Sequence, residues 1–142
     1  MEYRIKILVI DGQGGRIGRQ IIQGIIEKVP DAEVTAVGTN SAATVTMAKG
    51  GAVRAATGEN AVVVGCRTAD VIVGPIGITI ADSLLGEITP KMAVAVGQSS
   101  AVKILIPVNR CKNVVVGVED MPVSRMVELT IGAIEKAVNE EC

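Results

Sequence analysis

Apolar and polar positions along the chain follow two different periods, and the changes between these periods mark the expected elements. Residues 4–10 form a β-rich apolar run, which predicts a first strand ending at a glycine-rich turn. Apolar residues then recur at helical spacing over residues 16–29, with polar residues on the opposite face, and Pro30 ends the pattern. The opening of the chain is therefore predicted to be a strand, a tight glycine turn and an amphipathic helix.

The same alternation continues to the end of the chain and predicts further pairs of strands and helices. Strands are expected over residues 33–38, 52–56, 70–74, 103–107 and 113–118, and helices over residues 41–49, 60–66, 90–96 and 122–138. Asn60 is a candidate cap for the third helix, although three valines at 62–64 weaken that helix. Thr89 followed by Pro90 has the composition of a helix start, a capping side chain before a proline at the first helical position.

Alternating strands and helices with short connections predict one Rossmann-like α/β domain spanning residues 1–142, a doubly wound parallel sheet between two helical layers. The expected strand order is 3-2-1-4-5-6. In such sheets a ligand lies at the carboxyl ends of the strands, where the order reverses between strands one and four. Two glycine segments, 12–18 and 74–77, are expected to open into that crevice.

Composition narrows the possible partners. Fourteen basic and fifteen acidic residues give a net charge of -1, and Tyr3 is the sole aromatic residue, so neither charge nor base stacking favours nucleic acid. No apolar run reaches the roughly 18 residues of a membrane span, and the first residues lack the apolar core of a secretory signal. We therefore expect a cytoplasmic protein without a membrane partner.

The cysteine and hydropathy statistics add two expectations. Cys66, Cys111 and Cys142 are widely spaced and the chain has no histidine, so neither a disulfide framework nor a metal site is expected. The mean hydropathy of +0.46 is high for a small soluble domain. Together with the nearly uncharged stretch 76–85, it predicts a homo-oligomer that covers excess apolar surface.

The glycine-rich turn carries the clearest chemical signal. It comprises Gly12, Gln13, Gly14, Gly15, Arg16, Ile17 and Gly18, and follows Asp11. Between a strand and a helix, such glycines allow backbone N–H groups to approach a phosphate without obstruction, and the helix N-terminus adds positive potential. The turn therefore predicts a site for a phosphate-bearing ligand, with free backbone N–H groups from Gly14 to Gly18 as its donors. The alternative is a turn that only packs the helix on the strand.

The end of the second strand suggests which nucleotide would bind. NAD-binding domains place an acidic residue there on the ribose hydroxyls, whereas this chain has Thr39, Asn40 and Ser41. These residues and Arg16 are hydrogen-bond donors, and no carboxylate stands at this point to repel a 2'-phosphate, so NADP is favoured over NAD. The alternative is that Thr39, Asn40 and Ser41 only cap the second helix. From the second glycine segment, Gly74, Pro75 and Gly77 are added as expected cofactor contacts.

Residues 12–20 closely resemble the nucleotide loop of dihydrodipicolinate reductase, a family of NAD(P)-dependent Rossmann enzymes. The resemblance covers the first strand, loop and helix, and implies that Gly12, Gly15, Arg16 and Gly18 contact a dinucleotide. The lysine- and histidine-rich catalytic segment of that family has no counterpart in a chain without histidine, so hydride transfer is not implied.

Over its whole length the chain is similar to a bacterial family known as a domain of unknown function, DUF3842. The similarity rests on the segments at residues 11–15, 38–40, 56–60, 74–77 and 85–92. It implies no known activity.

Candidates for catalysis are few. Glu59, Asn60, Asn109, Arg110 and Cys111 follow strands three and five at the expected ligand edge, whereas Glu87 and Lys91 have the spacing of a local ion pair. Asp11 would repel a phosphate unless loop N–H groups bind its carboxylate or a cation neutralises it. Three hypotheses remain: an NAD(P)-binding module, a binding protein for a smaller phosphorylated metabolite, and an oligomeric scaffold without a ligand.

Overall fold

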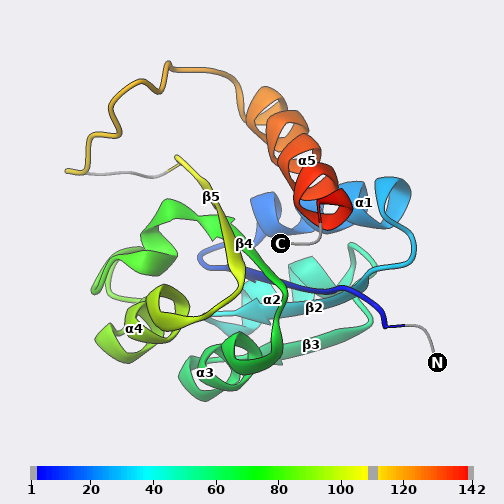
Figure 1. Cartoon of the computed structure of the whole chain (residues 1–142). Helices are drawn as coiled ribbons and strands as arrows, with labels where there is room; N and C mark the ends of the chain where they lie inside the picture. Colours follow the sequence, from blue (N-terminus) through cyan, green and yellow to red (C-terminus); the bar gives the residue numbers. More distant parts are fainter. Residues whose placement is uncertain (1–2, 109–111, 141–142) are drawn as a thin grey trace.

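The computed structural model describes residues 3–108 and 112–140, and its centre is a five-stranded parallel sheet (Figure 1). The strands are β1 (Lys6–Asp11), β2 (Glu33–Gly38), β3 (Arg54–Thr57), β4 (Val71–Pro75) and β5 (Val102–Ile106). The helices are α1 (Arg16–Lys28), α2 (Ser41–Ala48), α3 (Glu59–Thr68), α4 (Pro90–Gln98) and α5 (Val123–Asn139), with a short 3-10 helix, η1 (Ile76–Thr79), after β4. The strand order is β3-β2-β1-β4-β5, so β1 lies in the middle of the sheet.

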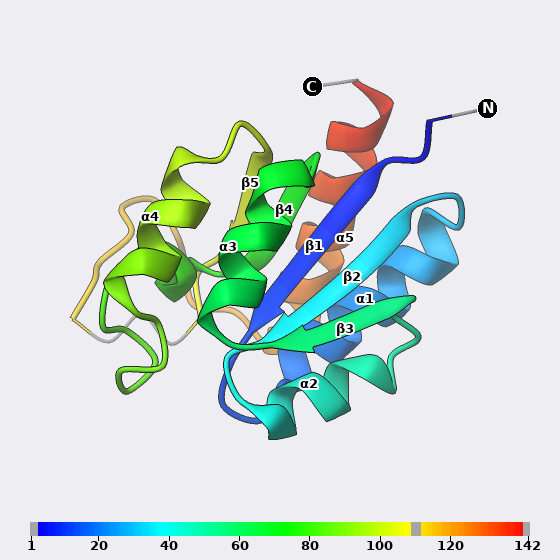
Figure 2. The same ribbon diagram turned by 90° about the horizontal axis from the view of Figure 1, so that it is seen from below.

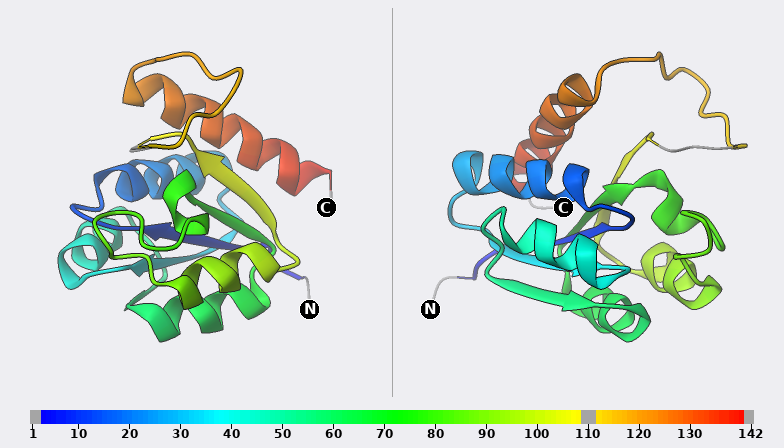
Figure 3. Two further views of the ribbon diagram at one scale, coloured as in Figure 1. Left: turned by 90° about the vertical axis from the view of Figure 1, so that its left-hand side faces the viewer. Right: turned by 180° about the vertical axis from the view of Figure 1, so that it is seen from behind.

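Helices cover both faces of the sheet, which confirms the predicted three-layer Rossmann-like architecture (Figures 2 and 3). One apolar core joins α1, α2 and α5 to one face through residues such as Ile22, Met47 and Ile134. The other core joins α3 and α4 to the opposite face through Val62 and Val96. β1 and β4 are buried almost throughout, which explains why their sequences are continuous apolar runs rather than alternating ones.

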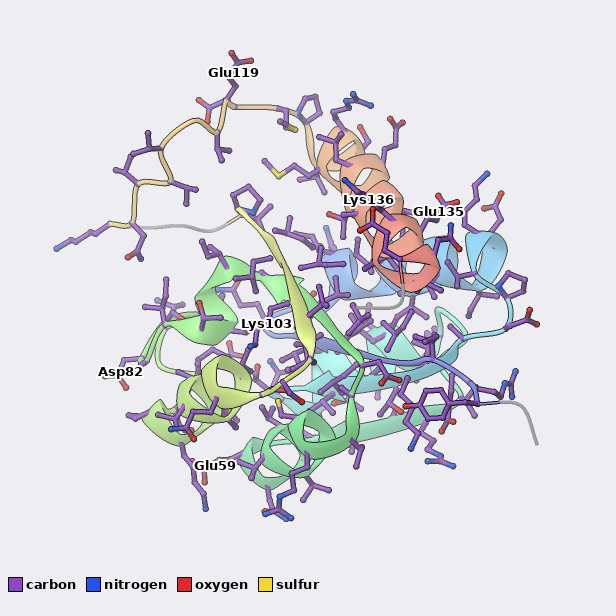
Figure 4. All side chains as sticks on the ribbon, in the orientation of Figure 1. Glu59, Asp82, Lys103, Glu119, Glu135 and Lys136 are labelled. Carbon is purple, nitrogen blue, oxygen red and sulfur yellow. The ribbon has the colours of Figure 1, made fainter. Side chains whose placement is uncertain are left out.

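The sixth strand predicted over residues 113–118 is wrong, because this segment pairs with no strand in the described structure. Residues 112–122 instead run away from the sheet before α5 begins, and Glu119 lies at their outer turn (Figure 4). The side chains of Val114 and Val116 are 86% and 94% exposed. A run of β-branched residues favours extended backbone but does not specify a pairing partner, so local pattern alone overestimates the sheet.

The stretch 76–85, one basis for the predicted oligomer, is partly used inside the chain. Ile78 and Leu84 belong to the core beneath α3 and α4, whereas Ile76 and Ile80 are only partly buried. The side chain of Leu85 is 94% exposed. The homo-oligomer remains a prediction that light scattering can test. Among the described residues, no helix has the length and apolar character needed to cross a membrane.

Candidate functional site

The candidate site forms where the carboxyl ends of β1 and β2 lie side by side. Asp11, the last residue of β1, is paired in register with Gly38, the last residue of β2. The backbone N–H of Thr39 donates a hydrogen bond of 3.0 Å to the carbonyl of Asp11. The glycine turn after β1 and residues 39–41 after β2 therefore begin at the same edge of the sheet, as the predicted topology requires.

Asp11 is tied to the glycine turn by both oxygens of its buried carboxylate. Oδ1 accepts a hydrogen bond of 2.8 Å from the backbone N–H of Gly12, and Oδ2 accepts one of 2.8 Å from that of Gly18. Burial raises the pKa of Asp11, the two backbone hydrogen bonds act to lower it, and the nearby charge of Glu87 raises it further, so the net direction is upward. Asp11 thus caps α1 from inside the fold. Of the two possibilities for this carboxylate, binding to loop N–H groups and neutralisation by a cation, the structure has the first.

Packing within the chain explains three of the four loop glycines. A Cβ atom at Gly12 would lie 2.7 Å from Oγ1 of Thr39, one at Gly15 would lie 2.6 Å from the carbonyl of Ala43, and one at Gly18 would lie 2.5 Å from the sulfur of Met47. Gly15 also has a φ of +72°, in the left-handed region that glycine tolerates. These glycines would be needed to seat α1 and α2 against β1 even without a ligand.

Gly14 differs from the other loop glycines, because a Cβ atom there would meet no atom within 4 Å. In the described part of the chain, the backbone N–H groups of Gly14, Arg16 and Ile17 have no hydrogen-bond acceptor. The expected row of free N–H groups from Gly14 to Gly18 is nevertheless wrong at two positions. Gly15 donates to the carbonyl of Gly12 at 3.0 Å, and Gly18 donates to Asp11.

A surface hollow lies directly over this turn. Its lining consists of residues 11–17 together with the side chain of Leu84, so every residue of the turn except Gly18 borders it. Gly14 and Arg16 are exposed to solvent. The hollow therefore brings free backbone donors and a cationic side chain to the surface at the beginning of a 13-residue helix.

Thr39 and Asn40 bind a carboxylate of their own chain. Oε1 of Glu87 accepts hydrogen bonds from Oγ1 of Thr39 at 2.5 Å, from Nδ2 of Asn40 at 2.7 Å and from the backbone N–H of Gln13 at 3.0 Å. Asn40 also caps α2, because its Oδ1 accepts a hydrogen bond from the N–H of Ala43 at 2.8 Å. Two of the four donors expected for a 2'-phosphate, Thr39 and Asn40, are therefore occupied, and the capping role of Asn40 is confirmed.

The ionised form of Glu87 is stabilised by these contacts. Partial burial acts to raise the pKa of its carboxyl group, but the hydrogen bonds from Thr39, Gln13 and Asn40 outweigh this effect and lower the pKa overall. The expected pair with Lys91 is wrong, because the described structure has no ion pair between these residues and Glu87 faces the glycine turn instead. A four-residue spacing brings two side chains together within a helix, and Glu87 precedes the first residue of α4.

Glu87 is held by a segment with unusual backbone conformation, residues 80–88, which we call the strap. Asp82, Leu84 and Leu85 have positive φ angles of 66°, 56° and 55°, although none is glycine. The side chain of Leu84 is buried against Gly12, and Ile88 is buried in the core beside α4. Asp82, at the outer side of the strap, points away from the sheet (Figure 4). Buried anchors thus maintain a conformation that costs free energy locally.

The second glycine segment lies beneath the strap rather than in the hollow. Gly74, Pro75 and Gly77 are buried and do not line the hollow over the glycine turn. A Cβ atom at Gly74 would collide with the carbonyl of Ile10 on the neighbouring strand, and the Gly77 carbonyl accepts a hydrogen bond from the hydroxyl of Ser83. The contacts of Gly74 and Gly77 are therefore with their own chain.

The remaining candidates are spread over other parts of the fold. Ser41 is exposed at the start of α2 and contributes no side-chain hydrogen bond among the described residues. Glu59 accepts a hydrogen bond of 2.7 Å from Thr89, which also caps α4 as predicted, so Glu59 ties the beginnings of α3 and α4 together. Gly58, not the expected Asn60, is the residue before α3. Asn109, Arg110 and Cys111 lie outside the described residues.

The sequence interpretation missed the interaction of Glu87 with the glycine turn and with Thr39 and Asn40. Two signals in the sequence could have pointed to Glu87: it follows β4, whose carboxyl end borders the crevice, and it precedes the Thr89-Pro90 helix start. Topology alone places such a residue at the ligand edge. The link to Thr39, 48 positions earlier, depends on the path of the strap and has no local signature.

Comparison with known proteins gives a family and no function. A family model described as a domain of unknown function, DUF3842, matches residues 6–139. No curated protein and no solved structure matches the chain.

Proposed function

The chain belongs to this family of unknown function, and from the geometry of its glycine turn we propose that it binds a small phosphate-bearing ligand, with NAD or NADP as the specific candidates. The observation that supports this proposal is the set of free N–H groups at Gly14, Arg16 and Ile17 beneath an open hollow. Unpaired N–H groups at a helix N-terminus need acceptors, and phosphate oxygens supply several at once. The exposed guanidinium of Arg16 adds a charged donor.

Asp11 limits where the phosphate can bind. Its carboxylate already accepts the N–H of Gly18, so a ligand is left with the N–H groups of residues 14, 16 and 17. The negative charges of Asp11 and Glu87 reduce the positive potential of the helix end. We therefore expect modest affinity for free phosphate, with a larger share of the binding free energy coming from the rest of the ligand.

The experiment is calorimetric titration of the wild type, Gly14→Val and Arg16→Ala with NAD, NADP and pyrophosphate. Valine at position 14 meets no protein atom within 4 Å of its Cβ, so the fold is retained while the side chain fills the approach to the turn. We expect Gly14→Val to lose at least about tenfold in affinity, because its side chain fills the approach to the turn. Arg16→Ala should lose less, because the exposed guanidinium contributes less than the roughly 1.5–3 kcal/mol of a fully formed charged hydrogen bond.

Gly132→Val is the matched control, since a Cβ at this position of α5 also meets nothing within 4 Å and lies far along the chain from the turn. It should bind like the wild type. Ligand at 100 times its dissociation constant should add about 2.7 kcal/mol to the free energy of unfolding, which a thermal-shift assay detects. Absence of heat with all three ligands at millimolar concentration would reject the proposal.

A second candidate function is a scaffold that binds no ligand. It is favoured by the contacts of Gly12, Gly15 and Gly18, each of which is explained by close packing within the chain. A third candidate is a site for a smaller phosphorylated metabolite. It is favoured because Thr39 and Asn40 already donate to Glu87, so the turn is free to bind a phosphate but these two neighbouring donors are not available to the rest of a dinucleotide. A thermal-shift screen of sugar phosphates separates these two candidates.

A further inference from the structure

The carboxylate of Glu87 lies at the end of β2 although the sequence of β2 supplies no acid there. Glu87 reaches this position from the strap and contacts Thr39, Asn40 and the backbone of Gln13. These residues directly follow β2 and β1, at the edge where the two strands are paired. In dinucleotide-binding sheets, a carboxylate at this edge accepts hydrogen bonds from ribose hydroxyls.

The two oxygens of the carboxylate differ in their surroundings. All three donors bind Oε1, and within the described residues Oε2 accepts no hydrogen bond. Glu87 is only partly buried, so Oε2 remains accessible to a ligand. Because the protein's hydrogen bonds are all made to Oε1, Oε2 can still accept hydrogen bonds from a ligand. Two adjacent hydroxyl groups are neutral donors that match such an acceptor.

The strap and hydrogen bonds within the chain hold this carboxylate in position. Leu84 and Ile88 anchor the strap on either side of Glu87, and the three hydrogen bonds restrict the side chain itself. Glu87 is also next to the free N–H groups, since its partner Gln13 directly precedes Gly14. A phosphate on the turn and a ribose at Glu87 would therefore be neighbouring parts of one nucleotide.

Resting on the nucleotide site proposed above, we propose that Glu87 is its ribose-recognising residue, and that the ligand is a nucleotide with free 2'- and 3'-hydroxyl groups. A 2'-phosphate would place a second anion against a fixed carboxylate, and Thr39 and Asn40 are already engaged by that carboxylate. This proposal reverses the order expected from the sequence of residues 39–41, so NAD should bind more tightly than NADP.

The test compares NAD, NADP and pyrophosphate on the wild type, Glu87→Gln and Glu27→Gln. Glutamine at 87 keeps one carbonyl oxygen, which can still accept from Thr39 and Asn40. It replaces the other carboxylate oxygen by an NH2 group, which is a donor, and removes the negative charge. Glu27 is exposed on α1 and makes no hydrogen bond or ion pair among the described residues, so Glu27→Gln controls for net charge.

We expect the wild type to prefer NAD over NADP by at least about tenfold, and Glu87→Gln to reduce that ratio by about tenfold through weaker NAD and stronger NADP binding. Pyrophosphate binding should tighten by less than about threefold, because it depends on the turn and gains only from removal of the nearby, solvent-screened charge of Glu87. Glu27→Gln should retain the wild-type ratio.

Three outcomes would overturn the inference, and the first two are distinguishable from failure of the phosphate site. Equal affinities for NAD and NADP that Glu87→Gln leaves unchanged would show that Glu87 does not recognise the ribose, while pyrophosphate binding would preserve the site itself. Uniformly tighter binding of all three ligands to Glu87→Gln would make Glu87 an internal competitor for the site. No binding of any ligand, pyrophosphate included, would reject the site and this inference together.

Discussion

The two segments that meet at the middle of the sheet reach their positions in opposite ways. The turn after β1 is short and uses glycine where a Cβ atom would collide with the chain, as at Gly15, while Gln13 is its non-glycine residue in the left-handed region. The strap after β4 is long and places leucines in the left-handed region, held by a buried side chain and a bound carboxylate. The first segment is specified by local backbone chemistry and the second by its tertiary contacts.

This difference decides what each segment contributes to the site. The turn offers backbone N–H groups, whose positions follow from the strand and helix on either side. The strap offers a side chain, Glu87, whose position depends on the anchoring of Leu84 and on donors that follow β2, Thr39 and Asn40. A site built from both should respond differently to substitution in each, and the following predictions test that contrast from the largest expected effect to the smallest.

Gly15→Val should cause the largest loss of stability, at least about 3 kcal/mol, because it combines a left-handed φ with overpacking in a crowded position. The new Cβ would lie 2.6 Å from the backbone carbonyl of Ala43, which cannot move without displacing α2. The measurement is denaturant unfolding against Gly14→Val, which introduces the same side chain into open space. Similar losses in the two variants would contradict the crowding argument.

Leu84→Ala should cost about 2–3 kcal/mol, as expected for truncating a buried leucine. Leu85→Ala is the control, since Leu85 has nearly the same φ but a side chain that is 94% exposed, and surface changes usually stay within about 0.5 kcal/mol. Urea unfolding of both variants measures the contribution of the anchor. If the two losses are equal, the strap is not held by Leu84.

Glu87→Gln should lower stability by about 1 kcal/mol at neutral pH, the typical net value of hydrogen bonding in a partly exposed setting. The folded pKa of Glu87 lies below its ordinary value of 4.5, so its contribution is present above that pH and is lost as the pH falls through the folded value. The difference between variant and wild type should therefore shrink below pH 4.5. A difference that grows on acidification would contradict the assignment.

Leu85→Asn should have the smallest effect and the opposite sign, a gain of about 0.5–1 kcal/mol. Asparagine tolerates the left-handed region at lower cost than leucine, and the exposed side chain of Leu85 loses no packing. Thermal unfolding measures the gain. A loss would show that the exposed leucine contacts something outside this chain, for which a second copy is the first candidate to test by light scattering.

The pattern of the sequence specifies the first half of this fold more fully than the second. Residues 33–38 form the predicted strand without any shift, because a β-rich run between a proline-ended helix and a capping asparagine admits one interpretation. Residues 113–118 have a similar β-branched composition but lie outside the sheet. Strand formation needs a pairing partner, and the sequence around these residues does not provide that information.

The site divides in the same manner. The glycine turn could be predicted, because its glycines lie close together in the sequence between one strand and one helix. Asp11, at the start of the turn, is bound by loop N–H groups, which is one of the two arrangements expected for it. The use of its N–H groups could not be predicted in detail, since Gly15 and Gly18 donate within the chain. The contact of Glu87 with Thr39 could not be predicted either, because a non-glycine left-handed backbone in the strap brings the two residues together.

The central position of β1 also sets an order of events during synthesis of the chain. β1 pairs with β2 on one edge and with β4 on the other, and about 60 residues separate Asp11 from Val71, where β4 begins. At about 5–20 residues per second, roughly 3–12 s pass on the ribosome with one edge of β1 unpaired. During that time the edge of β1 at Ile7 and Val9, which later pair with Val71 and Val73 of β4, is open to other nascent chains. The yield of folded protein should therefore depend on the rate of translation between α1 and β4.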